Sequence, residues 1–205
     1  MAQLVAQKRV LLADLTGDSI RAMSGSMVAY QGQVEFKSAG MGGGGGFRAA
    51  IRQRVAGESI SLMECTGHGR VHLAYQAQDV TVIGVQNDTV TVESEHVLAV
   101  TRDLQLDVQF AGLRGMTTGQ GLATTKVSGS GQLAIVSDGP LIGLDVAPGQ
   151  PVVVDPDAYV AGLGQLQMSL VSGVTWRSLV GEGGGEPFSL RFEGHGRVYI
   201  QPAER

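Results

Sequence analysis

Short runs of alternating apolar and polar residues recur along the chain and predict β-strands. In the clearest run, four apolar residues alternate with three polar residues over positions 104–110. The same period of two is found at 34–37, 80–82, 90–92 and 190–193, and Asn87-Asp88 predicts a turn between the second and third of these runs. Because successive side chains of a strand point to opposite faces, this period is typical of half-buried antiparallel strands. We therefore predict an all-β protein, either an antiparallel β sandwich or a double-stranded β-helix-like domain, with at most one or two short helices.

One motif, Gly-x-Gly followed by alternating apolar residues, occurs three times. The copies are Gly67-His68-Gly69, Gly129-Ser130-Gly131 and Gly194-His195-Gly196, and they are almost evenly spaced along the chain. Only glycine adopts a positive φ without strain, so we interpret these six glycines as structural positions at hairpin bends or β-bulges.

A second motif, which ends in alanine, follows each of the first two copies of Gly-x-Gly at the same distance along the chain. It is Val97-Leu98-Ala99 in one copy and Tyr159-Val160-Ala161 in the next. A third copy, Met27-Val28-Ala29, stands near the beginning of the chain. We therefore predict a single domain, 1–205, made of three β repeats: about 57–110, about 121–171, and a split unit that joins 187–201 to 9–37.

This division of the chain makes a geometric prediction. The strand around 188–200 should lie beside the segment around 9–36, so that the two ends of the chain complete a pseudo-threefold ring. An isolated unit of about 60 residues buries too little surface to be secure alone, whereas three units around one axis can share a core.

Glycine-rich stretches precede each Gly-x-Gly copy. The longest run, 42–46, stands before a segment, 47–55, that could form a short helix. Free backbone amides at a helix N-terminus attract anions, so a phosphate site is one interpretation of this run. No Gly-Lys-Ser/Thr follows it, however, and a flexible connector is the interpretation we favour.

Composition narrows the possible functions. The net charge is −4 and 17% of residues are charged, which argues against a general nucleic-acid binder with its basic stripe. Cys65 is the only cysteine, so an internal disulfide and a cysteine-based zinc cluster are excluded. No apolar run is long enough to cross a bilayer as a helix, and the first residues lack a secretory pattern. We therefore expect a cytoplasmic protein without a transmembrane segment.

One weak candidate polar site stands out. His68 and His195 occupy matching positions in two Gly-x-Gly copies, and each is followed two residues later by an arginine, Arg70 or Arg197. The remaining copy has Ser130 and Gln132 at these positions, so a threefold metal site would lack a ligand. Exposed turn histidines are the simpler interpretation, and His72 and His96 add no recognisable ligand spacing.

The sequence contains no recognisable catalytic motif. No serine stands in a Gly-x-Ser-x-Gly elbow between strand and helix, and the four glutamates between 58 and 95 form no clear acid–base pair with a histidine or lysine. We therefore predict no catalytic residue, no metal and no cofactor.

The chain resembles the altered-inheritance-of-mitochondria protein 24 family. The similarity lies in Ala56-Gly57-Glu58-Ser59 after a polyglycine stretch, Gly-x-Gly-x-Val, Val97-Leu98-Ala99, and a C-terminal Phe192-Glu193-Gly194-x-Gly196-x-Val198. Two residues beyond Ser59, the phenylalanine expected from the family is Ser61, which is a departure from the pattern. The resemblance implies a fold like that of the tryptophan RNA-binding attenuation protein and no catalytic residues. It also implies a link, for mitochondrial members, to inner-membrane organisation and respiratory-complex assembly.

Three functions remain after these observations. The leading hypothesis is a non-enzymatic β scaffold or binding protein that forms homo-oligomers or contacts protein partners. The alternative is RNA or small-ligand binding by analogy with the attenuation-protein fold, against which the acidic net charge argues. An enzyme is third, since its site would have to be assembled from the histidines and arginines of different repeats.

Overall fold

The computed structural model describes residues 2–38, 60–110, 123–172 and 188–203. Twelve strands form one antiparallel sheet, and two short 3-10 turns are the only helical elements in these ranges. The all-β prediction is therefore confirmed. The glycine run 42–46 and the helix considered at 47–55 lie outside the described residues.

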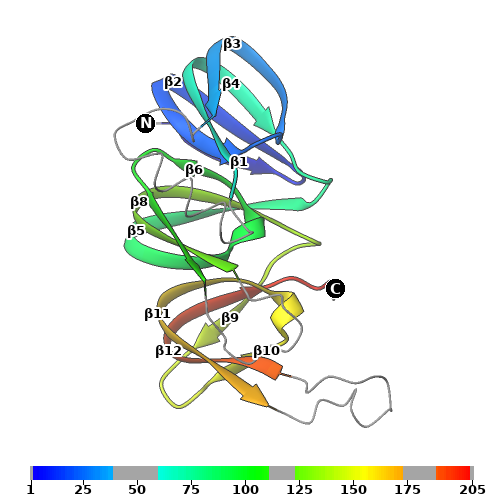
Figure 1. Cartoon of the computed structure of the whole chain (residues 1–205), viewed down its shortest axis with the longest axis vertical. Helices are drawn as coiled ribbons and strands as arrows, with labels where there is room; N and C mark the ends of the chain where they lie inside the picture. Colours follow the sequence, from blue (N-terminus) through cyan, green and yellow to red (C-terminus); the bar gives the residue numbers. More distant parts are fainter. Residues whose placement is uncertain (1, 39–59, 111–122, 173–187, 204–205) are drawn as a thin grey trace.

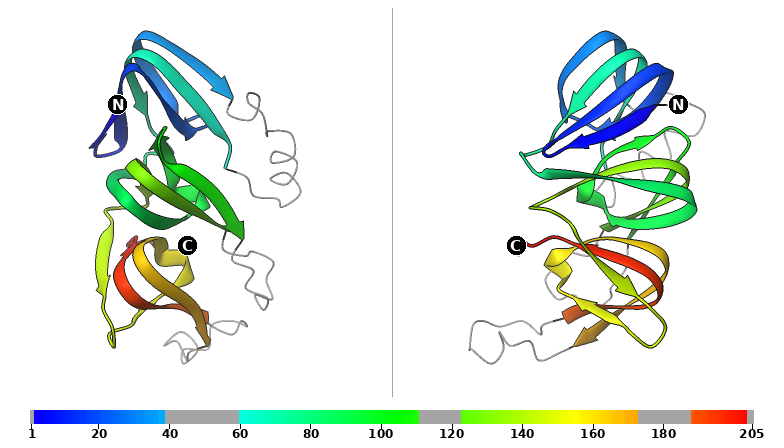
Figure 2. Two further views of the ribbon diagram at one scale, coloured as in Figure 1. Left: turned by 90° about the vertical axis from the view of Figure 1, so that its left-hand side faces the viewer. Right: turned by 180° about the vertical axis from the view of Figure 1, so that it is seen from behind.

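The strands form three groups that follow one another along the long axis of the molecule (Figures 1 and 2). The N-terminal unit contains β1 (Gln3–Gln7), β2 (Val10–Met23), β3 (Met27–Ser38) and β4 (Leu62–Leu73). The middle unit contains β5 (Asp79–Glu93), the turn η1 (Ser94–His96), β6 (Val97–Thr101), β7 (Gln105–Phe110) and β8 (Ala123–Ser137). The C-terminal unit contains β9 (Ile142–Val146), β10 (Val152–Val154), the turn η2 (Pro156–Ala158), β11 (Tyr159–Ser172) and β12 (Phe188–Ile200).

The strand that carries Gly-x-Gly lies between two partners in every unit. These central strands are β4, β8 and β12, and each pairs on one side with the strand that begins at the alanine motif. The three alanine pairs are Ala29 with His72, Ala99 with Ala134, and Ala161 with Tyr199. In each pair the partner lies five residues after the first glycine, and a register shift falls just before the alanine. The three hairpins therefore share one register.

The predicted pairing between the two ends of the chain is wrong. The strand β12 pairs with β9, β10 and β11, whereas β2 and β3 pair with β1, β4 and β6. Each alanine motif thus pairs with the Gly-x-Gly strand that follows it in the chain, so none of the three hairpins is split. The expected closed ring is also absent from the described sheet, because its strand order runs as an open path from β10 to β3.

The units are joined to one another by strand pairing. At the first joint, β2 pairs with β6, and Ala22 lies opposite Ala99. At the second joint, β5 pairs with β11, and Val92 lies opposite Ala161. Ala22 and Val92 in turn pair with central-strand residues that lie four positions before the first glycine of Gly-x-Gly. Both joints therefore pair the same three-residue segment of one unit with the motif alanine, and the two residues after it, of the next unit.

The hydrophobic core follows the same organisation. The alanine motif of the middle unit contributes Leu98 and Ala99 to the core cluster of the N-terminal unit. The alanine motif of the C-terminal unit likewise contributes Val160 and Ala161 to the core cluster of the middle unit. All four residues are fully buried. Each joint thus combines strand pairing with burial of apolar side chains, which is the main stabilising term in protein association.

Cys65 provides a test of how tightly the N-terminal unit is packed. It lies on β4 between Ile20 of β2 and Phe36 of β3, and it is fully buried. Burial, with a smaller contribution from the charge of Glu64, raises the pKa of the Cys65 thiol to about 11. We expect Cys65 of the folded protein to react with a thiol reagent at pH 8 only as fast as the protein unfolds. The absorbance of the chromophore that the reagent releases measures this rate.

The same pKa predicts how stability changes with pH. An unfolded thiol ionises near pH 8.5, as a rough value, whereas the folded Cys65 holds its proton until about pH 11. Above pH 8.5 the folded state therefore binds more protons, and stability falls as pH rises through this window. Cys65→Ala would remove this thiol-dependent part of the decrease. An immediate reaction of the native thiol at pH 8 would contradict the packing described here.

Candidate functional site

The four residues of the candidate polar site are not brought together. Arg70 pairs with Asp14 across β4 and β2, with 2.6 Å between Nε and Oδ1. Arg197 pairs with Asp145 across β12 and β9 at 2.7 Å. These ion pairs belong to the N-terminal and C-terminal units, with the middle unit between them (Figure 1). A site shared by the two histidines and two arginines does not form within this chain.

The electrostatics of both pairs are those of exposed surface contacts. The hydrogen bond to Asp14 and its charge raise the pKa of Arg70. The Arg197 guanidinium lowers the pKa of Asp145 through a hydrogen bond and its charge. His68 and His195 are exposed on the same strands. Exposed ion pairs contribute little to stability, so these residues are best described as cross-strand surface contacts.

The matching position in the middle unit serves the assembly of the units. Here Gln132 lies opposite Gly84, where the other units place an aspartate. The Gln132 side chain reaches β1 of the N-terminal unit: its Oε1 accepts from the Leu4 amide at 2.9 Å, and its Nε2 donates to the Leu4 carbonyl at 3.3 Å. One position of the motif thus supports an ion pair within a unit or a bond between units.

The six glycines of Gly-x-Gly lie within the central strands rather than at hairpin ends. Gly67, Gly69, Gly129 and Gly194 have positive φ, while Gly131 and Gly196 are not among the residues with positive φ. The neighbouring strands shift register opposite Gly67 and Gly129. The glycines therefore mark the place where three strands approach closely and one of them carries an extra residue.

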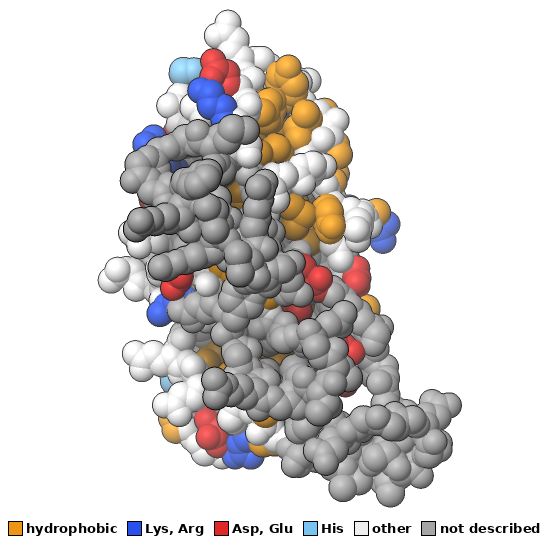
Figure 3. All heavy atoms as spheres, viewed as in Figure 1, with side chains coloured by type: hydrophobic (Ala, Val, Ile, Leu, Met, Phe, Trp, Pro, Cys, Tyr) orange, Lys and Arg blue, Asp and Glu red, His pale blue; other side chains and the backbone are white. Residues whose placement is uncertain are grey.

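The two ends of the sheet are the strands β3 and β10, each paired on one side only in the described part of the chain. On β3 the alanine motif is exposed. Val28 is 60% exposed, whereas its counterparts Leu98 and Val160 are 0% exposed. Met27 and Tyr30 are 37% and 49% exposed. Hydrophobic side chains gather on the upper part of the face shown in Figure 3, in the end of the molecule that holds the N-terminal unit.

The strand β10 is the counterpart of the segment that receives the alanine motif. Val154 pairs with Leu190, four positions before the first glycine of its Gly-x-Gly copy, as Ala22 and Val92 do in the other units. The segment Val152–Val154 therefore corresponds to 20–22 and to 90–92. Its central residue, Val153, is 54% exposed. Within the described sheet, one end thus presents an alanine motif whose second edge has no partner strand, and the other presents a receiving segment whose second edge has none.

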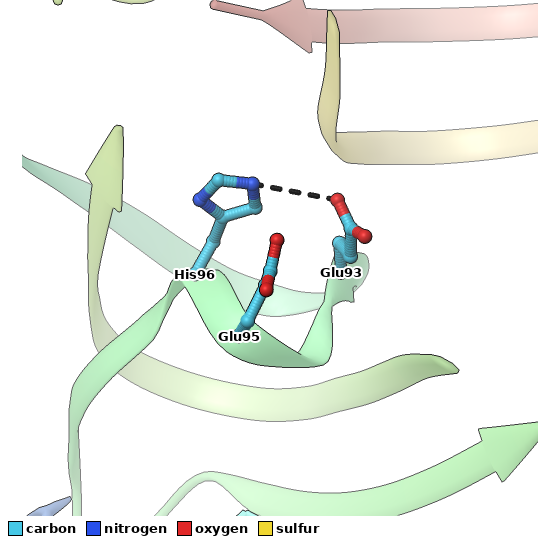
Figure 4. A group of neighbouring side chains, drawn as sticks. All are labelled: Glu93, Glu95 and His96. Atoms are coloured by element: carbon cyan, nitrogen blue, oxygen red, sulfur yellow. Dashed lines mark ion pairs between the residues drawn. The ribbon is translucent and has the colours of Figure 1, made fainter. Parts of the chain in front are cut away.

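A separate cluster of side chains lies at the end of β5, on the turn η1. Glu93, Glu95 and His96 place one donor atom each within 4.8 Å of the others. His96 is 1% exposed, and its Nδ1 lies 2.8 Å from the Val136 carbonyl oxygen. Its Nε2 lies 3.4 Å from Oε2 of Glu93, and Figure 4 shows this pair pointing toward each other. The turn is also held by Ser94, whose hydroxyl lies 2.9 Å from that of Thr125.

The middle and C-terminal units meet close to this cluster. The hydroxyl of Tyr159 donates to the carbonyl of Thr91 at 3.0 Å. Burial, followed by the negative charge of Glu93, raises the pKa of Tyr159. His96 has no recognisable role in the sequence, because residue spacing reveals neither its burial nor the direction of its ring.

Comparison with known protein families identifies the family of this chain. The model of the mitochondrial biogenesis AIM24 family matches residues 4–203, which is nearly the whole chain. The chain belongs to the AIM24 family. The resemblance found in the sequence is therefore confirmed, whereas the fold of the tryptophan RNA-binding attenuation protein stays a prediction.

A solved structure supports the AIM24 fold described here. The chain is similar to a Streptococcus pyogenes protein whose crystal structure was determined in a structural genomics programme, with a TM-score of 0.77 and 22% sequence identity. The alignment covers 100% of this chain and 94% of that one. This likeness concerns the fold alone. No curated protein matches the chain, and among the described residues no helix is long and apolar enough to cross a bilayer.

Proposed function

We propose that this AIM24-family chain is a non-enzymatic scaffold that assembles head to tail, with β10 of one copy pairing with β3 of the next. The observation that carries this proposal is the pair of complementary ends. The chain forms the same joint twice internally, and the end strands of the described sheet, β3 and β10, carry the segments that correspond to the two halves of such a joint.

The internal joints fix the register of the proposed contact. Ala99 lies opposite Ala22, and Ala161 lies opposite Val92. The corresponding contact between copies places Ala29 opposite Val154, which in turn sets Tyr30 opposite Val153. Antiparallel addition of a strand to a free sheet edge is a common mode of protein association, because it satisfies unpaired backbone groups on both edges.

Burial of apolar side chains would stabilise this contact. Val28 is 60% exposed in the single chain, while the residues at its position in the internal joints are fully buried. Complete burial of a valine side chain contributes roughly 1.5–3 kcal/mol, reduced here by the fraction that is already covered. Tyr30 and Val153 add further apolar surface that the contact would cover.

The two ends differ from each other, which determines the kind of assembly. When two copies join through two different surfaces, the pair still carries one unused surface of each kind. Further copies can therefore add to form an open chain, or the two unused surfaces can meet and close a ring. A closed dimer through two identical surfaces is not the expected product. Scaffolds that organise other molecules commonly use such repetition, as in solenoid proteins.

Sedimentation velocity over a wide range of protein concentration tests the proposal. The wild type is expected to form a series of species larger than a dimer, whereas Val28→Asp should remain monomeric because a carboxylate would be buried without a partner. Val5→Asp is the matched control, since Val5 is 38% exposed on β1 and lies outside the proposed contact. A wild type that stays monomeric throughout, or a Val28→Asp variant that assembles as the wild type does, would refute it.

The register can be tested separately with opposite charges. Val153→Glu and Tyr30→Lys should each weaken assembly alone, because each places a charge opposite an apolar side chain. In the double variant Val153→Glu/Tyr30→Lys, every contact between copies places the two new charges opposite each other, so assembly should return because they attract. A double variant that assembles no better than either single variant would contradict the proposed register.

The described surface favours a scaffold over an RNA-binding protein. Arg70 and Arg197 each pair with a carboxylate, so neither offers phosphate an unpaired cation. The net charge of −4 also opposes association with a polyanion. RNA binding, which the sequence had suggested only by analogy of fold, therefore gains no support from these two arginines.

A further inference from the structure

We propose that Glu93, Glu95 and His96 bind a divalent transition-metal ion on the turn η1. This proposal is independent of the assembly described above, because it rests on the chemistry of one buried histidine in the middle unit.

The surroundings of His96 determine which of its ring nitrogens carries a proton. The Val136 carbonyl oxygen can only accept a hydrogen bond, so Nδ1, 2.8 Å away, is the donor. In the neutral ring, Nε2 then presents a lone pair. This nitrogen is buried without a hydrogen-bond partner and faces a carboxylate oxygen of Glu93 at 3.4 Å. The lone pair of the buried Nε2 and the partly buried Glu93 carboxylate repel each other unless a cation, either a proton or a metal ion, lies between them.

The distances suit a small metal ion. Ligands bound about 2.0–2.1 Å from a tetrahedral ion lie roughly 3.3–3.4 Å from each other. The separation of Nε2 from the Glu93 carboxylate has this value, at 3.4 Å. The carboxylate of Glu95 supplies the third donor within 4.8 Å, from an exposed position through which an ion and a water ligand could enter.

The second partner of His96 also fits a metal ligand. Metal-bound histidines nearly always donate their other ring N–H to a carboxylate, a backbone carbonyl or water, which fixes the ring and its tautomer. The bond from Nδ1 to Val136 provides this contact. One imidazole and two carboxylates suit Zn²⁺ or Mn²⁺ better than Ca²⁺, which prefers oxygen ligands alone.

The corresponding turn of the C-terminal unit, η2, has the same backbone position but lacks the histidine and both glutamates. There Ala158 occupies the position of His96, and the side chain of Asp155 caps its own turn by accepting from the Asp157 amide at 3.0 Å. The Glu93 side chain makes no such cap. It turns toward His96 instead, so the cluster is a feature of the middle unit rather than a requirement of the fold.

Isothermal titration of chelator-treated protein with Zn²⁺, and separately with Mn²⁺, tests the proposal. One ion per chain is expected to bind, with a higher melting temperature in its presence, because an ion that binds only the folded state stabilises it. Glu95→Gln, which changes an exposed side chain, should weaken binding by about tenfold or more. His195→Ala is the matched control: it removes an exposed histidine and should leave the binding unchanged.

Nitrogen NMR of the His96 ring supplies a readout that folding defects do not imitate. Zn²⁺ should shift the resonance of Nε2 while Nδ1 keeps its proton. The proposal is overturned if no stoichiometric binding occurs, or if Glu95→Gln binds as tightly as His195→Ala does. It is also overturned if both ring nitrogens carry protons at neutral pH and Zn²⁺ changes neither, since His96 would then form a plain ion pair with Glu93.

Discussion

Gly194→Ala is expected to destabilise the protein by roughly 3–5 kcal/mol, measured as the free energy of unfolding in urea. Gly194 has a φ of +116°, a conformation that alanine adopts only with strain. A Cβ atom at this position would also lie 2.2 Å from the carbonyl oxygen of Gln165 on β11. That oxygen belongs to the backbone of the paired strand, so the clash can be relieved only by separating two strands of the sheet.

Two further glycines serve as controls for this prediction. At Gly84 an added Cβ meets no atom within 4 Å, so Gly84→Ala should be neutral or stabilise by up to about 1 kcal/mol. At Gly129 the nearest atom is the Asp103 carbonyl oxygen at 3.0 Å, because the facing strand is interrupted between β6 and β7. Gly129→Ala should therefore fall between the other two. Equal stability of the Gly194 and Gly84 variants would show that the close approach of β11 and β12 is wrong.

Leu98→Ala is expected to lower the free energy of unfolding by about 2–5 kcal/mol, because it opens a cavity in a packed joint between two units. Leu98 is 0% exposed and lies in the core cluster of the N-terminal unit, although it belongs to the alanine motif of the middle unit. The substitution should therefore loosen the contact between the two units as well as the core. Urea unfolding at a protein concentration low enough to prevent assembly measures this loss.

Val28→Ala is the matched comparison, since Val28 holds the same position of the motif on the free strand β3. It is 60% exposed, so its truncation should change the stability of the single chain by less than about 0.5 kcal/mol. At high protein concentration, Val28→Ala should also lower the free energy of unfolding relative to the wild type, because assembly would bury this side chain. This loss should be absent in dilute protein. Equal losses for Leu98→Ala and Val28→Ala in dilute solution would mean that β3 is covered within one chain.

The sequence alone was sufficient for the strand content, because alternation is a local property of the chain. A period of two in residues such as those at 104–110 has only one compatible backbone conformation. The Gly-x-Gly and alanine motifs also marked positions that pair in matching register in three hairpins. Together with Ala56-Gly57-Glu58-Ser59 they carried the resemblance to the family, which is confirmed. These features are carried by residues close together in the chain.

Which strands are neighbours was decided only by the tertiary structure. The regular spacing of the motifs is the same whether an alanine motif pairs with the Gly-x-Gly copy before it or the one after it. Which of these pairings is more stable depends on loop connections and on apolar contacts between residues far apart in the chain, and no local sequence pattern contains this information. For the same reason the sequence could not show that Val28 is exposed where Leu98 is buried, nor that the His96 ring faces Glu93. Burial and side-chain direction exist only once the strands have paired.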